Sequence, residues 1–220
     1  MPTNRQMKKK INLIVFVIIF FLLQNKIVLS QIENSVIISV GDYPITRLDL
    51  LKEIKLIAIL SNTEINQDNK EQIQGLAVKS LIKRNIKENE IKRRNISKYN
   101  KKQLETLISS TSKKIGLDRD GLKMILENNN LSYEELIKRF ETDLKWNYMI
   151  FQIYKNKISL NAAEIEDKLQ LRLENLESPN DKKINLIKEQ IINSEKEKKL
   201  NMFSNMHFSN LERLIQINFL

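Results

Sequence analysis

The sequence offers few residues that could carry catalytic or metal chemistry. It contains one histidine, His207, and no cysteine in 220 residues. A metal site or a catalytic triad needs several such groups brought together, so His207 in "FSNMHFSNLERL" is expected to be a partly exposed helix residue. The glycine-based patterns for phosphate loops, dinucleotide binding and nucleophile elbows are absent. The sequence therefore predicts a protein that is not an enzyme and uses no metal, nucleotide or other cofactor.

Other side chains that could belong to a site are better explained by the helices that carry them. The pairs Glu134–Glu135 and Glu164/Asp167 stand at predicted helix starts, where negative charge complements the helix dipole. Capping explains them more simply than acid–base catalysis. Trp146 and the methionines are expected mainly in the core: Met124, Met149, Met202 and Met206. As an alternative, methionines and aromatic residues near the end of the chain could line an apolar groove for a client protein.

The first thirty residues have the pattern of a secretory signal peptide. They carry bases but no acids around the run "LIVFVIIFFLL" (13–23), which suits a signal sequence and is short for a membrane span. An uncleaved inner-membrane anchor is the alternative. Five of the 37 bases lie in this leader, so 32 remain against 27 acids. The leader predicts export to the periplasm. The remaining charges are mixed along helices, which argues against a nucleic-acid partner and leaves transient contact with an anionic membrane surface open.

The rest of the chain is predicted to be mainly α. A β-branched run at about 36–40 and an alternating segment at about 214–219 predict two strands. Since isolated strands are unstable in water, the two should pair and close 31–220 into a single domain, with a helical core (31–170) and a returning helix and strand (171–220). Apolar spacing predicts helices over about 48–60, 70–93, 101–114, 118–129, 133–154, 162–176 and 182–200, with an extension of the last to 211 left open.

The stretch "VGDYPITRLDL" (40–50) is predicted to be a corner between strand and helix. Gly41 and Asp42 supply a tight turn, and Pro44 keeps the preceding residue extended. Thr46 then caps the helix, with Asp49 at the capping-box position.

The helix predicted over 70–93 carries a glycine in its interior. Gly75 costs about 1 kcal/mol relative to alanine, and it marks either a close helix crossing or tolerated slack. The spacing predicts that four apolar residues of this helix face inward: Ile73, Leu76, Ala77 and Leu81.

Three stretches resemble the N-terminal domain of SurA-like periplasmic chaperones. The first is "VGDYPITRLDLLKEIKLIA" (40–58), with Ile45, Thr46 and Asp49 at the helix start. The second is "VKSLIKRNIKENEIKRRNI" (78–96), and the third is "LSYEELIKRFETDLKWNYMIFQIYKNKISLNAAEIEDKL" (131–169). The resemblance covers roughly 33–170 and rests on structural motifs.

The resemblance implies an ATP-independent holdase that binds unfolded outer-membrane β-barrel precursors. In that family one or two parvulin prolyl isomerase domains follow the last of these helices. Only about 50 residues remain after Leu169, too few for such a domain and the returning segment, so the resemblance implies a chaperone core without isomerase activity. A non-catalytic envelope scaffold that binds one specific protein is the alternative, and a prolyl isomerase without a recognisable module is a more remote one.

Overall fold

The computed structural model describes residues 34–174, 176 and 179–220, so the predicted leader lies outside the described residues. The fold is mainly α, as predicted. Two compact units divide it: one runs up to Leu81 and includes Gln216–Leu220, and the other is Ile82–Ile215. Over the described ranges, no helix combines the length and apolar character needed to cross a membrane.

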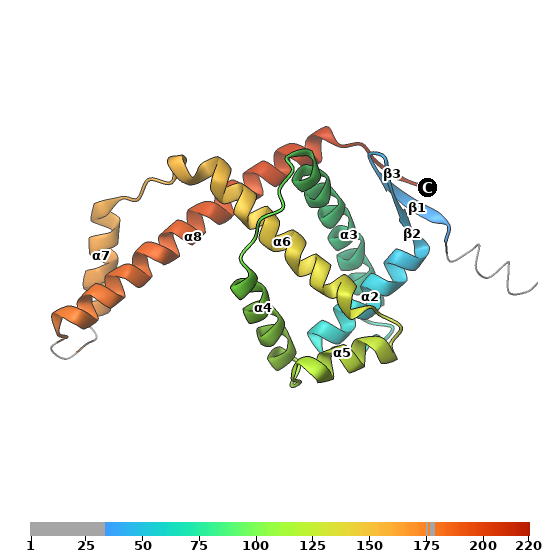
Figure 1. Ribbon diagram of the computed structural model, residues 1–220, viewed down its shortest axis with the longest axis horizontal. Coiled ribbons are helices and arrows are strands. Elements are labelled where there is room, and N and C mark those ends of the chain that lie inside the picture. The colour runs from blue at the N-terminus through green and yellow to red at the C-terminus, as the bar shows by residue number, and fades with distance from the viewer. Residues whose placement is uncertain (1–33, 175, 177–178) are drawn as a thin grey trace, which may run out of the picture. The chain divides into compact units, whose positions relative to one another are not determined.

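A small antiparallel sheet in the first unit joins the two ends of the described chain. It consists of β1 (Val36–Val40), β2 (Tyr43–Thr46) and β3 (Ile217–Phe219) in the order β2-β1-β3 (Figure 1). Ile38 lies opposite Phe219 and Val40 opposite Ile217. The predicted pairing of the first and last strands is therefore confirmed, although β3 begins later than expected because helix α8 continues to Leu214.

Strand β2 is the part of the sheet that the sequence did not predict. Gly41, with φ 57°, and Asp42 form a two-residue connection, and Val40 pairs with Tyr43. A positive φ at the first position is typical of a type II′ hairpin turn. The stretch was predicted to be a corner from the strand into the helix, in which Pro44 only keeps Tyr43 extended. Proline is tolerated on an edge strand, however, and β2 is an edge strand here.

Helix α2 (Arg47–Ser61) starts with the predicted capping box. Asp49 N donates to Thr46 Oγ1 at 3.1 Å, and Thr46 N donates to Asp49 Oδ2 at 2.9 Å. The buried carboxylate of Glu53 accepts from the Ser80 hydroxyl at 2.7 Å. This bond links α2 to the part of α3 that belongs to the same unit.

Helix α3 (Lys70–Arg93) contains the boundary between the two units. Ile73, Ala77 and Leu81 are buried as predicted, but Leu76 is 49% exposed, so its inward placement was wrong. An added Cβ at Gly75 would meet no described atom within 4 Å apart from its two neighbours and the nearby backbone of α3 itself. Of the two interpretations of this glycine, tolerated slack is therefore correct.

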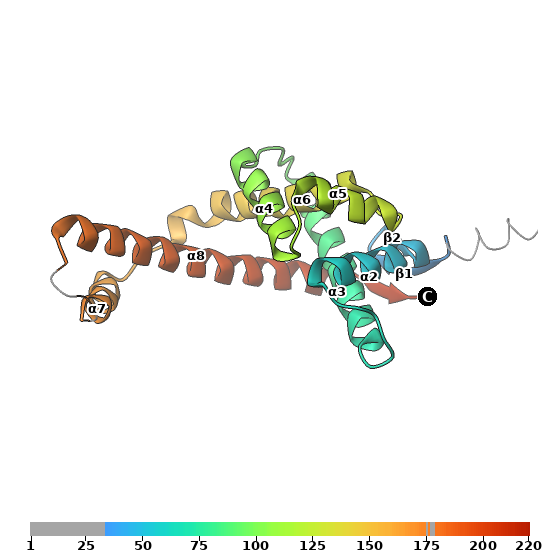
Figure 2. The ribbon, with the colours of Figure 1, turned by 90° about the horizontal axis from the view of Figure 1, so that it is seen from below.

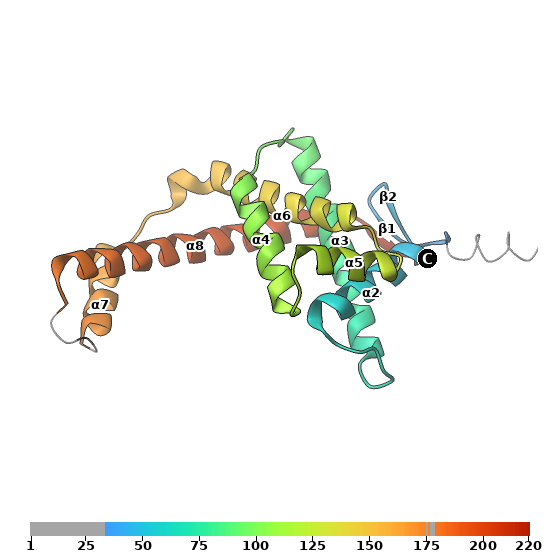
Figure 3. The same cartoon turned by 60° about the horizontal axis from the view of Figure 1, so that its bottom comes forward.

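In the second unit, α6 contacts several other helices. The elements are α4 (Lys101–Lys114), α5 (Arg119–Asn128), α6 (Tyr133–Tyr154), the 3-10 turn η1 (Lys155–Lys157), α7 (Ala162–Leu173) and α8 (Asp181–Leu214). Helix α6 packs against α4, α5 and α8 (Figures 1 and 3). Its cap is the predicted one, since Ser132 Oγ accepts from Glu135 N at 3.2 Å.

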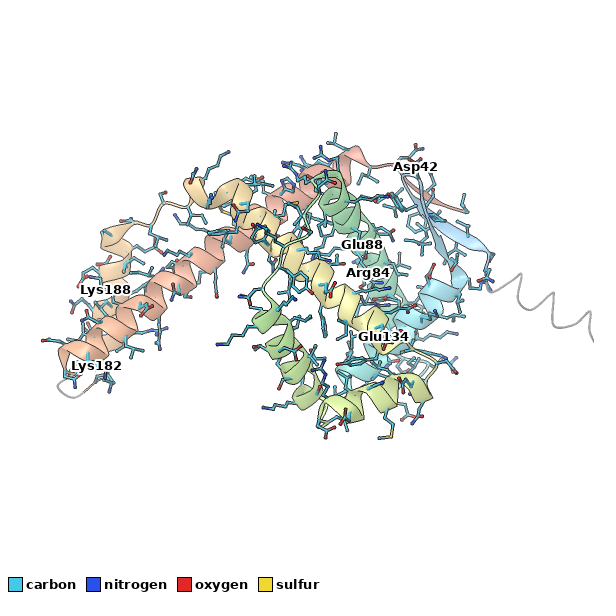
Figure 4. The ribbon with its side chains drawn as sticks, in the orientation of Figure 1. Asp42, Arg84, Glu88, Glu134, Lys182 and Lys188 are labelled. Atoms are coloured by element: carbon cyan, nitrogen blue, oxygen red, sulfur yellow. The ribbon has the colours of Figure 1, made fainter. Side chains whose placement is uncertain are left out.

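Two apolar clusters hold α8 within this unit. One surrounds Trp146 and Tyr154 of α6 and includes Phe203 and Phe208 of α8. The other joins α7 to the N-terminal half of α8, which lie side by side (Figure 2), through Ile165, Leu169 and Ile191. Lys188, labelled in Figure 4, lies 3.1 Å from Glu166 across this hairpin.

Candidate functional site

Three neighbouring hollows in the second unit form a groove along α6. It consists of a middle hollow of about 460 Å³ flanked by hollows of about 560 and 490 Å³. Gln103, Leu144 and Asn147 join the middle hollow to the first flanking one, and Asn100 and Tyr148 join it to the second. We call the three together the α6 groove, and its two ends the α3 end, which Lys87 lines, and the loop end, formed by residues 97–101.

Each wall of the α6 groove is one face of a helix. Residues spaced by three, four and seven positions share a helix face. Helices α4, α6 and α8 each contribute such a set of residues to the lining. The sets are Gln103, Thr106, Leu107 and Ser110 on α4; Leu144, Asn147, Tyr148 and Phe151 on α6; and Glu197, Leu200, Asn201 and Ser204 on α8.

The lining of the groove combines an apolar floor with amide side chains. Buried Ile150, together with Leu144 and Leu200, gives the floor, and Phe151 remains 44% exposed. Four amides stand around them: Asn100, Gln103, Asn147 and Asn201. Because an amide side chain both donates and accepts hydrogen bonds, it can pair with the backbone of an extended peptide. The arrangement can bind apolar side chains and peptide backbone without reading one sequence.

Hydrogen bonds behind the groove fix the α8 wall. Trp146 Nε1 donates to Ser204 Oγ at 2.7 Å. One turn further along α8, His207 Nδ1 lies 3.0 Å from the hydroxyl of Tyr154, and its Nε2 lies 3.3 Å from Glu90 Oε1. The indole ring of Trp146 meets the imidazole edge-on, with ring centroids 5.6 Å apart. These contacts set the register of α8 against α3 and α6.

Glu90 is the charged centre of this network, with 3% of its side chain exposed. Burial alone would raise its pKa, but hydrogen bonds from Arg93 and Arg94 and their positive charges outweigh burial and lower the pKa to about 2. Glu90 therefore stays ionised at neutral pH. It holds both arginines at the end of α3 and contacts α8 through His207.

The loop end of the groove is attached to α6 through one tyrosine. Tyr99 donates its hydroxyl to Glu141 at 2.9 Å, and this hydrogen bond raises the pKa of Tyr99. Lys145 forms an ion pair with the same carboxylate at 3.3 Å and lies 5.3 Å from the centre of the Tyr99 ring. The loop is thus positioned at one end of the groove.

The structure confirms the predicted burial of some residues singled out in the sequence and contradicts that of others. His207 is a partly exposed residue of α8, as predicted, with 13% of its side chain exposed, and both ring nitrogens have partners. Trp146 and Met149 are core residues, as expected. Three methionines are exposed, so their placement in the core was wrong, and none of them lines the groove: Met124, Met202 and Met206.

The acidic pairs lie at helix starts, where capping was expected. Ser132 donates its hydroxyl to Glu134 Oε2 at 3.1 Å at the start of α6 (Figure 4), and Glu164 in the first turn of α7 forms an ion pair with Lys168. Across the described residues, no cluster of three or more histidine, cysteine or acidic side chains is arranged to hold a metal ion.

Comparison with known proteins gives a distant likeness to solved structures. No protein family and no curated protein matches the sequence. Among solved structures, the chain matches a SurA-like chaperone of the human pathogen Campylobacter jejuni, one of a structurally related pair, the virulence factor PEB4 and the periplasmic protein Cj1289. The TM-score is 0.41 with 15% identity over 85% of this chain and 99% of that one. A likeness this distant does not carry an activity over to this chain.

Proposed function

We propose that this protein is an ATP-independent periplasmic holdase that binds unfolded outer-membrane β-barrel precursors and has no prolyl isomerase activity. The observation that carries the proposal is the α6 groove, with its apolar floor and amide walls. The sequence resemblance to SurA-like chaperones supports the same class of activity.

The groove suggests a simple binding mechanism. Apolar side chains of an extended client would cover Leu144, Phe151 and Leu200, and the amides would pair with the client backbone. Burying about 200 Å² of apolar client surface contributes about 5 kcal/mol before the cost of ordering the chain is subtracted. Such weak contacts, repeated along a client, hold it reversibly, so release requires no nucleotide.

Suppression of aggregation tests the activity. The purified protein, added in several-fold excess, should keep an unfolded outer-membrane barrel protein from aggregating when denaturant is diluted, with no effect of added ATP. No suppression would contradict the proposal. Saturable binding to one folded envelope protein, with indifference to unfolded clients, would instead establish a scaffold.

Two matched substitutions test whether the groove is the binding site. Phe151→Ser removes a groove side chain that is 44% exposed, and Met206→Ser removes an equally exposed side chain that lies outside the groove. We expect Phe151→Ser to weaken suppression severalfold and Met206→Ser to leave it unchanged. Equal effects of the two substitutions would place client binding elsewhere.

Export is the second part of the proposal. The basic, acid-free leader with its apolar run supports cleavage near Gln31. Mass spectrometry of the protein recovered from the cell envelope should give the mass of 31–220. A full-length mass in the membrane fraction would indicate the anchored alternative.

A further inference from the structure

The two ends of the α6 groove differ in charge. At the α3 end, Lys87 forms an ion pair with Asp143, so the charges cancel. At the loop end the charged lining residues are Lys98 and Lys101, and neither forms an ion pair with any residue in 34–174, 176 or 179–220. The α3 end of the groove is therefore neutral and the loop end is cationic.

The polar groups at the loop end are mainly donors. A lysine ammonium offers three donors and no acceptor. The side-chain carbonyl of Asn100 already accepts from Lys102 N at 3.0 Å and Gln103 N at 3.2 Å, which leaves its Nδ2 group to donate to a ligand. The hydroxyl of Tyr148 adds a further donor to the same hollow. A pocket of this composition is complementary to carboxylates.

The one other charged side chain of the described lining also favours placing a ligand carboxylate at the loop end. Glu197 lines the middle hollow from α8 and is absent from the lining of the loop end. A carboxylate of a ligand would be repelled in the middle of the groove and attracted at the loop end. Apolar ligand residues are matched to the middle, where Leu144, Phe151 and Leu200 lie.

We propose that the α6 groove selects extended segments in which an apolar stretch is flanked on one side by acidic side chains, with the acids at Lys98 and Lys101. This inference rests on the proposed function and adds the class of client segment. Two lysines match two acidic residues better than the single charge of a chain terminus, so side-chain carboxylates are the proposed ligand.

Synthetic peptides provide the test. Four peptides of about twelve residues would share one apolar core and carry an uncharged fluorophore at the other end. Three end in Asp-Asp, Asn-Asn or Lys-Lys with an amidated terminus, and the fourth ends in Asn-Asn with a free carboxylate. Fluorescence anisotropy with the full protein should show the Asp-Asp peptide binding roughly three- to tenfold more tightly than the amidated Asn-Asn peptide, as expected for two exposed ion pairs, and the Lys-Lys peptide binding most weakly.

Lysine variants locate the effect. The double variant Lys98→Gln/Lys101→Gln should lose the preference, so that it binds the Asp-Asp and amidated Asn-Asn peptides with equal affinity. Lys102→Gln removes a charge from the neighbouring position, which does not line the groove, and should keep the preference. All three substituted lysines are exposed, so the variants should fold.

The outcomes separate the two proposals. Equal wild-type binding of the Asp-Asp and amidated Asn-Asn peptides, or equal effects of Lys102→Gln and the double variant, would overturn the acidic preference. If the free-carboxylate peptide bound as tightly as the Asp-Asp peptide, the site would take a chain terminus, which would also overturn the inference. If the wild-type protein still suppresses aggregation in any of these cases, the holdase proposal stands. If the wild-type protein does not suppress aggregation at all, the proposed function itself is contradicted.

Discussion

At the scale of single residues, two glycines of this chain should respond in opposite ways to the same substitution. Gly41 has a φ of 57° in the turn between β1 and β2, and its N–H donates to Gln216 O at 2.8 Å. A side chain is strained at such a φ, so Gly41→Ala should lower the free energy of unfolding by about 1 kcal/mol or more. Gly75→Ala, inside α3 with open space around it, should raise it by up to about 1 kcal/mol. Urea unfolding of both variants measures the difference, and a stabilising Gly41→Ala would show that the turn is not as described.

Glu90 should make the stability of the protein depend on pH in the acid range. Its pKa is lowered from 4.5 to about 2 in the folded chain, so folding favours the ionised carboxylate. The stabilisation is complete above pH 4.5 and is lost as the pH falls from about 4.5 towards 2. At about 1.4 kcal/mol per pKa unit, it amounts to at most about 3.5 kcal/mol.

Urea unfolding at several pH values measures this contribution. The free energy of unfolding of Glu90→Gln should lie below that of the wild type at pH 7, and the gap should narrow as the pH approaches 3. A gap that stays constant with pH would mean that the substitution acts through packing rather than through the charge.

At the scale of elements, the α7–α8 hairpin has its own small core. Leu169 is 3% exposed and packs with Ile165 and Ile191. Leu169→Ala should destabilise the hairpin by about 2–4 kcal/mol through a lost contact and a residual cavity. Leu186→Ala is the matched control, because Leu186 lies on the same hairpin and is 50% exposed. Hydrogen exchange should then show faster exchange of α7 amides in Leu169→Ala while the α4–α6 amides keep their protection, and a uniform loss of protection would mean that the hairpin does not open separately.

The same elements show what the sequence could and could not predict. Helix positions follow from apolar spacing and from caps such as Thr46 and Ser132, which depend on residues near in sequence. The α6 groove was not predicted. Residues such as Asn147 and Asn201 have the spacing of a helix face, but polar residues at that spacing are also typical of a face in water. That the two faces lie across a hollow depends on how α4 and α8 pack on α6, which no local pattern encodes.

At the scale of the whole molecule, we predict that the described chain unfolds as one cooperative domain although it contains two compact units. The described part of the first unit, 34–81 and 216–220, has 53 residues, a size at which an independent core is marginal. Helix α3 runs through the boundary between Leu81 and Ile82 without interruption. Since helix formation is cooperative along the chain, unfolding either unit would leave the other with a frayed half of α3.

Two probes report on the units separately. Trp146 is the one tryptophan of the sequence and is 1% exposed in the second unit, so its fluorescence reports unfolding there. Exchange of the Leu220 amide, which donates to Ile37 O at 2.9 Å, reports the sheet of the first unit. Under cooperative unfolding both probes give the same free energy and the same urea dependence. A lower value at Leu220 than at Trp146, beyond the fraying of a strand end, would mean that the sheet and α2 open first and that the chain is two domains joined by a shared helix.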